Sequence, residues 1–207
     1  MLNQNQNQQQ NMTTSHQVPN QFMHAGHEMF DAHEAIRTIA GGLEQCLMYE
    51  QHVQDPELKG IMQRQKAFNS QLYNTMIETL KTGQKPSVST QVYNMDQGTN
   101  NLTIYGTKPA QPKPPAASVQ DISDKCIAGF VLGNLKTAAS CCTMAALEAT
   151  NPVMRRVFAD SVPNLIEEAY EVFLYSNKKG YYQVPQLKDE DMQNMMSGFA
   201  PIQTTTH

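Results

Sequence analysis

Two Asx-Pro turns constrain the fold of this chain more than any other feature: Asp55-Pro56 and, 96 positions later, Asn151-Pro152. An Asp or Asn side chain can accept hydrogen bonds from the free N–H groups at a helix start. Proline at the next position lacks the N–H that would otherwise go unpaired. Each turn is therefore expected to begin a helix. Apolar residues recur at helical spacing on both sides of each turn, so the sequence predicts two helical hairpins.

The second hairpin, expected over residues 119–185, has the clearer pattern. Small apolar residues dominate its first helix and large ones its second, which allows close approach of the two helices. The apolar positions are Ala128, Val131, Leu132, Leu135, Ala138, Ala139, Cys142, Ala145, Ala146 and Ala149, then Met154, Val157, Phe158, Val162, Leu165, Ala169, Val172 and Phe173. Lys178, Lys179 and Gly180 end the second helix, and Pro163 is expected to kink it.

The first hairpin is expected over residues 23–83, with helices from Met23 to His52 and from Pro56 to Gly83. Its predicted apolar positions are Phe30, Ile36, Ala40, Leu43 and Leu47, then Leu58, Ile61, Met62, Phe68, Leu72, Met76 and Leu80. Gly41-Gly42 lies inside the first helix, and we interpret it as a close helix–helix contact. The two hairpins share one layout, as if duplicated. Packed face to face they would form an all-α four-helix bundle.

The remaining segments are polar. Residues 84–118 form a Pro-rich crossover linker long enough to run the length of the bundle, which is the connectivity of ferritin-like folds. Short extended pieces are expected at 91–93 and 102–105, on the bundle surface. Residues 1–22 are a Gln/Asn-rich tail that we expect to be disordered. Residues 186–207 are a Met-rich tail, either a short amphipathic helix or disordered.

Charge and hydropathy exclude several classes of function. The net charge is −4 and the isoelectric point is about 5.8, so the composition gives no basis for binding nucleic acid. We find no apolar run near the roughly 18 residues that span a bilayer and no secretion signal at the N-terminus. The chain is therefore expected to stay inside the cell that makes it, without inserting into a membrane.

The four cysteines, Cys46, Cys126, Cys141 and Cys142, all fall in predicted helices. Their spacing fits neither a zinc site nor the disulfide framework of a secreted protein. We interpret them as small apolar side chains in the core. Oxidative cross-linking is the alternative, and Cys126, near a helix start, is the thiol most expected to be exposed.

A ferritin-like layout requires a test for metal ligands. Di-iron bundles carry Glu-x-x-His on two of their helices, and neither the second nor the fourth predicted helix contains that motif. His24, His27, Asp31 and His33 gather near the first helix start, where a weak surface metal site competes with the simpler interpretation of a solvated helix end. We therefore predict no catalytic, cofactor-binding or metal-binding residues and no cofactor.

Five polar residues fall on or beside the apolar stripes, and we interpret them as an interior cluster that fixes helix register rather than as a site. They are His33, Glu50, Gln65, Glu148 and Glu168.

Several short motifs lie between Ile122 and Pro185. They are 124–125 (DK), 132–136 (LGNLK), 145–152 (AALEATNP), 155–156 (RR) and 180–185 (GYYQVP). With these motifs the segment resembles the spore coat F family of endospore-forming bacteria, although the family pattern does not require Pro163. The resemblance implies a ferritin-like helical hairpin or bundle in a structural spore coat component, made in the mother cell. It implies other coat proteins as partners and no enzymatic activity.

Three functions therefore compete at this point. The first is a non-catalytic assembly protein of the spore coat, acting through its bundle surface and tails; Gln–Lys, Tyr or Cys cross-links are a further hypothesis. The second is a metal-binding or di-iron-like protein that uses the His-rich start of the first helix. The third is an adaptor whose Met-rich tail binds a partner helix. Self-association and exchange of hairpins between copies stay open.

Overall fold

Both Asx-Pro turns begin helices in the computed structural model, which describes residues 15–96 and 102–202. Asp55 Oδ1 accepts a hydrogen bond from Glu57 N at 2.9 Å. Asn151 Oδ1 accepts bonds from Val153 N and Met154 N at 2.9 and 3.1 Å. These caps separate α1 (Gly26–Tyr49) from α2 (Pro56–Thr82), and α3 (Asp124–Glu148) from α4 (Pro152–Lys178). The predicted hairpins are thus confirmed to within a few residues at each end.

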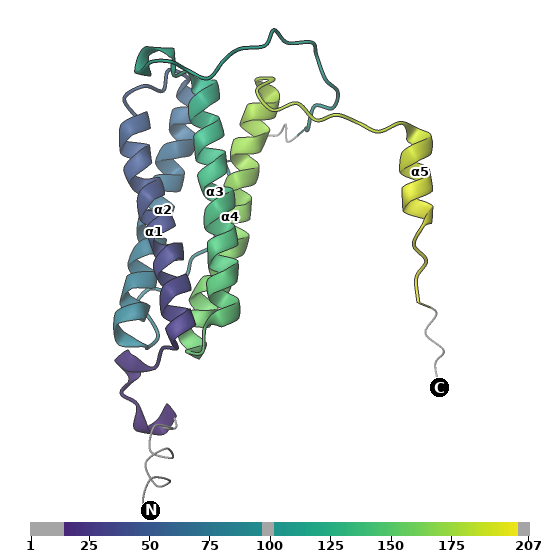
Figure 1. Cartoon of the computed structure of the whole chain (residues 1–207). Helices are drawn as coiled ribbons and strands as arrows, with labels where there is room; N and C mark the ends of the chain where they lie inside the picture. Colours follow the sequence, from purple (N-terminus) through teal and green to yellow (C-terminus); the bar gives the residue numbers. More distant parts are fainter. Residues whose placement is uncertain (1–14, 97–101, 203–207) are drawn as a thin grey trace, which may run out of the picture.

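The four helices pack as one all-α bundle (Figure 1). Around the bundle, α1 contacts α2 and α3, and α4 contacts α2 and α3. The chain crosses from the end of α2 back to the opposite end of the bundle before α3 begins, so α3 starts beside the α1–α2 turn. One long crossover of this kind is the connectivity found in ferritin-like bundles. Within the described residues, extended pairing is limited to bridges from Tyr105 and Gly106 to Val184.

The core follows the predicted stripes of α2, α3 and α4, but the prediction of which α1 residues are buried is partly wrong. Phe30 and Leu47, expected inside, are 76% and 55% exposed. Ile36 is buried as predicted, and Ala32, Ala35 and Ile39 complete the buried apolar face of α1. The prediction included Phe30 and Leu47 and omitted Ala32 and Ala35, whereas α1, which packs against the alanine-lined α3, buries the two alanines, because small residues on both helices allow close packing.

At Gly42, α1 lies in close contact with α3. A Cβ atom on Gly42 would lie only 2.5 Å from the side-chain oxygen of Asn134 on α3, whereas one on Gly41 would meet nothing within 4 Å. The predicted helix–helix contact is therefore correct for the second glycine alone.

α4 continues through Pro163, and the side chain of Asn164 donates a hydrogen bond to Asp160 O at 2.8 Å. The kink at Pro163 stays a prediction.

The two hairpins hold each other's turns through equivalent carboxylates. Glu28 on α1 accepts hydrogen bonds from Thr150 N and Asn151 N at 2.8 and 3.1 Å. Asp124 on α3 accepts bonds from Gln54 N and Asp55 N, both at 3.0 Å. The shift of 96 positions that superimposes the turns also places Glu28 on Asp124. The contact is therefore reciprocal, with each first helix bonding the turn of the other hairpin, as expected for two hairpins of common layout.

The crossover is bonded to the bundle along its course. Thr75 on α2 donates a hydrogen bond to Val88 O at 3.1 Å. Asn177 near the end of α4 accepts a bond from Ile104 N at 2.6 Å and donates one to Ile104 O at 2.9 Å. Beyond α4, Tyr182 folds back so that its ring contacts Phe173 edge-on, with centroids 5.3 Å apart. The predicted extended piece near Ile104 is thus confirmed.

The tails differ in part from expectation. Residues 15–17 and 20–22 form short 3-10 turns instead of a disordered segment, while positions 1–14 lie outside the described residues. The Met-rich tail contains a helix, α5 (Asp189–Ser197), in accord with one of its two predicted forms.

One helix of the described chain, α3, is long and apolar enough to cross a membrane by length and composition alone, which the sequence analysis did not foresee. A core helix passes the same test, and α3 packs its apolar stripe against α1 and α4.

Candidate functional site

The His-rich start of α1 does not gather into a metal centre. His24 Nδ1 lies 2.6 Å from Glu28 Oε1, and its Nε2 lies 3.1 Å from Leu80 O, so both ring nitrogens already have partners. His27 and His33 are exposed, and Asp31 is half-buried. Across residues 15–96 and 102–202, no group of three or more His, Cys, Asp or Glu side chains is placed to hold a metal ion.

Six buried or half-buried polar residues gather instead at the middle of the bundle, between α2, α4 and the crossover. We call this group the central polar cluster; it comprises Arg64, Gln65, Asn69, Tyr93, Glu168 and Glu171. Gln65 and Glu168 are 2% and 0% exposed. On α2, Gln65 and Asn69 lie one turn apart, as do Glu168 and Glu171 on α4, so both helices turn these side chains toward each other.

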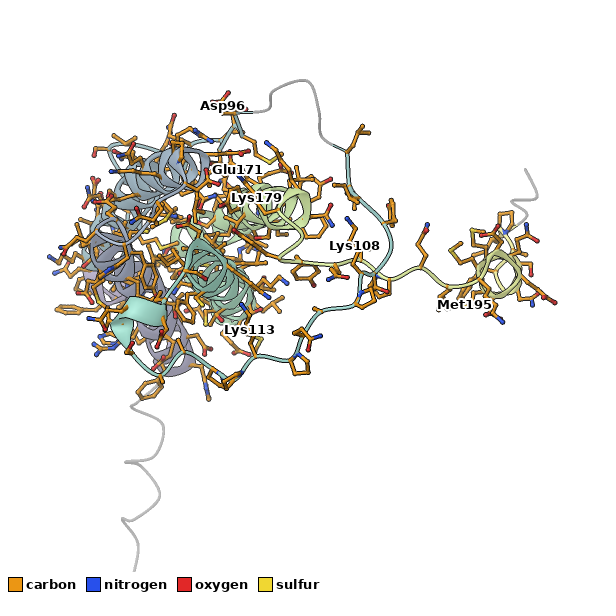
Figure 2. All side chains as sticks on the ribbon, turned by 90° about the horizontal axis from the view of Figure 1, so that it is seen from above. Asp96, Lys108, Lys113, Glu171, Lys179 and Met195 are labelled. Atoms are coloured by element: carbon orange, nitrogen blue, oxygen red, sulfur yellow. The ribbon has the colours of Figure 1, made fainter. Side chains whose placement is uncertain are left out.

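Glu171 is the acceptor that ties the cluster together. Its two oxygens accept hydrogen bonds from Arg64 Nη2 at 2.7 Å, Gln65 Nε2 at 3.1 Å and Tyr93 OH at 2.5 Å. Asp96 N adds a longer bond of 3.3 Å from the crossover, and Figure 2 shows Asp96 and Glu171 on the same side of the bundle. With four donors around it, this carboxylate has little capacity left for a ligand, and it fastens α2 and the crossover to α4.

Glu168 lies deeper and has a different charge state. Burial raises the pKa of its carboxyl well above the usual range, and the negative charge of nearby Glu171 raises it further; the hydrogen bond from Asn69 opposes the shift. That bond, from Asn69 Nδ2 to Glu168 Oε2, is 2.6 Å long. A carboxyl group in this setting is protonated at pH values where an exposed glutamate is ionised.

Three buried oxygens of the cluster receive no hydrogen bond from another described protein group: Gln65 Oε1, Asn69 Oδ1 and Glu168 Oε1. Gln65 and Asn69 also line a cavity of about 30 Å³, beside Cys46. A cavity this small has room for one or two water molecules, not an organic substrate. Burial, with the charge of Glu50 next, raises the pKa of the Cys46 thiol to about 11, so it is a poor nucleophile. The cluster is therefore suited to holding helices in register.

The predicted interior residues are placed in part as expected. Gln65 and Glu168 are buried, but His33 and Glu148 are exposed, which corrects the prediction for both. Their positions flank the α1 and α3 stripes, and the rotation of each helix turns them outward. Glu50 is half-buried and accepts a hydrogen bond from Lys66 Nζ at 2.9 Å.

The sequence analysis missed Tyr93, which it placed on the surface and which is 6% exposed. Asn164 holds this part of the crossover: its side chain accepts from Tyr93 N at 2.8 Å and donates to Gln91 O at 2.9 Å. The available signal was an aromatic side chain within a polar linker, where Tyr93 is one of two with Tyr105.

Cys126 is the cysteine with the most reactive surroundings. All four cysteines are free, and Cys142 is buried. Hydrogen bonds from the backbone and hydroxyl of Ser123 lower the pKa of the Cys126 thiol, whereas burial raises that of Cys142 to about 12. We therefore expect Cys126 to react with a thiol reagent at pH 8 at least about tenfold faster than Cys142. Cys126→Ser should remove the fast phase in an absorbance assay; a fast phase that persists would contradict the assignment.

Comparison with known proteins identifies a family domain over the second hairpin and a relative similar along nearly the whole chain. The Coat F domain profile matches residues 123–185, which hold α3, the Asn151 turn, α4 and the returning aromatic segment. Over 199 residues the chain is 44% identical to the Spore coat protein F-like protein YhcQ of Bacillus subtilis (strain 168), covering 96% of this chain and 91% of that protein. No solved structure was found to match the chain. Similarity of this degree and extent shows that the chain belongs to the Coat F family of spore coat proteins.

Proposed function

We propose that this chain is a structural component of the bacterial spore coat, without catalytic activity of its own, and that it joins the coat through its bundle surface and its terminal segments. The observation that carries this proposal is the 44% identity to a spore coat protein F-like protein over 96% of the chain. Because the match extends well beyond the residues of the Coat F domain, the crossover and most of both tails belong to the conserved length.

The interior of the bundle supports a structural role. Glu171 already has four donors around it, and the adjoining cavity of about 30 Å³ is too small for a substrate. The exposed side chains therefore carry the contacts with other coat proteins. Several large apolar ones are available for this: Phe30, Leu47, Met144, Leu147 and Phe199 are each more than half exposed.

Localisation in sporulating cells tests the proposal. A tagged full-length chain replaces the native copy in an endospore-forming bacterium, and the purified spores are extracted for coat proteins. We expect the chain in the coat extract and at the spore periphery, with the tag alone, expressed from the same promoter, left in the mother-cell lysate. A chain that stays in that lysate would overturn the proposal. Stoichiometric iron or manganese in untagged purified protein would overturn its non-catalytic part.

A further inference from the structure

Helix α5 presents an apolar face to solvent and stands apart from the bundle in both views (Figures 1 and 2). Met192, Met195 and Met196 recur at helical spacing within α5 and so share one side, and Phe199 follows just beyond the helix end. Met195, Met196 and Phe199 are 65%, 69% and 88% exposed. The first turn of α5 is acidic, with Asp189, Glu190 and Asp191 in succession. An apolar helix face behind an acidic turn is suited to docking in an apolar groove with basic residues at one end.

The bundle has such a groove between the end of α3 and the start of α4. We call it the α3/α4 groove; it encloses about 340 Å³, and its main walls are Ala146, Leu147, Ala159 and Val162, with Arg155 and Arg156 at one end. Leu147 is 75% exposed. Along α3, residues 137–147 contain no charged side chain. The groove is therefore an apolar surface with a positive end.

The helix and the groove match in length and in charge order. Arg155, Ala159 and Val162 follow one face of α4 and span about 10 Å, while the helix from Asp189 to Ser197 spans about 12 Å. Laid parallel to α4, α5 would place its acidic turn at the arginines and its methionines on Ala159 and Val162. Arg156 now pairs with Asp160 at 3.5 Å, but both side chains are largely exposed, so exchanging that partner costs little.

The tether prevents α5 from making this contact within its own chain. Val184 is held at the far end of the bundle, where its carbonyl accepts a hydrogen bond from Gly106 N at 2.8 Å. The chain from Val184 to Asp189 reaches at most about 17 Å. Arg155 lies about 35 Å along α4 from Lys178, at the opposite end. Extended side chains do not close that difference, so the arginines that the acidic turn meets belong to another molecule.

We propose that α5 of one copy docks in the α3/α4 groove of a second copy, with residues 189–191 against Arg155 and Arg156. Each chain then offers one helix and one groove, at different places on its surface. An interface of this kind is heterologous and continues from copy to copy, forming a ring or an open chain. The inference rests on the proposed function for its biological purpose, since a coat component that repeats in this way would extend a shell.

Sedimentation of the purified full-length protein tests the contact with two charge reversals. The tail variant carries Asp189→Lys, Glu190→Lys and Asp191→Lys, and the groove variant carries Arg155→Glu and Arg156→Glu. We expect the wild type to exceed the monomer mass of 23.2 kDa increasingly as concentration rises. Each reversal should weaken association about tenfold or more. A 1:1 mixture should associate as the wild type does, because the intact α5 of the groove variant fits the intact groove of the tail variant, and the lysines of the tail variant fit the glutamates of the groove variant.

Combining both reversals in one chain separates docking from damage to a helix. The combined variant should regain self-association, because lysines on α5 then meet glutamates in the groove. Glu34→Lys with Arg37→Glu, on the exposed face of α1, is the matched control and should associate like the wild type. A monomeric wild type, or a combined variant as weak as the single reversals, would overturn the proposal. Self-association with absence from the coat would overturn the proposed function alone.

Discussion

Replacing Glu28 by alanine will lower the free energy of unfolding by about 4 kcal/mol. Glu28 is fully buried. Its Oε2 accepts bonds from the backbone of Thr150 and Asn151 and from the Thr150 hydroxyl, at 2.7–3.1 Å. Alanine leaves these donors without their acceptor, and the Asn151 N–H among them is buried, at the turn where the second hairpin meets α1. Urea unfolding followed by circular dichroism measures the loss.

Three matched variants test this clamp, and the first of them separates the hydrogen-bond acceptor from the charge. Glu28→Gln keeps an oxygen for the turn and should cost only about 1–2 kcal/mol. Asp124→Ala removes the equivalent clamp at the other turn, and should cost less than Glu28→Ala because Asp124 is only half-buried. Glu34→Ala, on the exposed side of the same helix, should change stability by less than about 0.5 kcal/mol. Equal losses for Glu28→Ala and Glu34→Ala would contradict the clamp.

The stabilisation by Glu28 also depends on pH in a defined direction. Burial alone would raise the pKa of this carboxyl, but the hydrogen bonds from His24, Thr150 and Asn151 outweigh it and lower the pKa below 4.5. The unfolded chain therefore binds the proton more tightly than the folded chain does. The contribution is present above about pH 4.5 and is lost as pH falls through the folded pKa. The Glu28→Gln variant should lack this acid-induced loss.

Replacing Glu168 by glutamine will raise the free energy of unfolding at pH 8 by about 2 kcal/mol. Burial raises the pKa of Glu168 well above 4.5 in the folded protein, so the folded chain holds a proton that the unfolded chain releases. Stability is therefore fully present below about pH 4.5 and falls as pH rises toward the folded pKa. Glutamine is neutral and of similar size, and it removes this penalty while its amide group keeps a polar partner for Asn69.

The pH dependence distinguishes this effect from a general change in packing. At pH 4 the carboxyl is protonated in the folded chain and largely so in the unfolded one, so Glu168→Gln should nearly match the wild type. The titratable or charged groups near Glu168 are Glu171 on α4, Cys46 on α1, Arg64 on α2 and Tyr93 on the crossover. Glu167→Gln removes a charge from the neighbouring exposed position and is the control. A destabilised Glu168→Gln protein at pH 8 would show that an ionised carboxylate is needed there.

The sequence by itself determined the parts of this protein that depend on near neighbours. Asp55 and Asn151 cap helices two or three residues away, so the chain shows where α2 and α4 begin without knowledge of distant contacts. Apolar spacing of three and four residues likewise predicted the buried faces of α2, α3 and α4, because a helix repeats every 3.6 residues wherever it lies. The Coat F motifs between Ile122 and Pro185 are short stretches of sequence on the second hairpin, so they too were recognisable without knowledge of distant contacts.

Only the tertiary structure decided which polar groups are buried and which face α1 turns inward. Phe30 is exposed and Ala32 is buried because α1 packs close to α3. The sequence of α1 alone does not show which of its faces meets that helix. Tyr93 reaches Glu171, and Glu28 reaches Thr150, across 78 and 122 positions. The partner that satisfies a buried polar group, and hence the pKa of Glu28 or Glu168, is fixed by which helices meet in space.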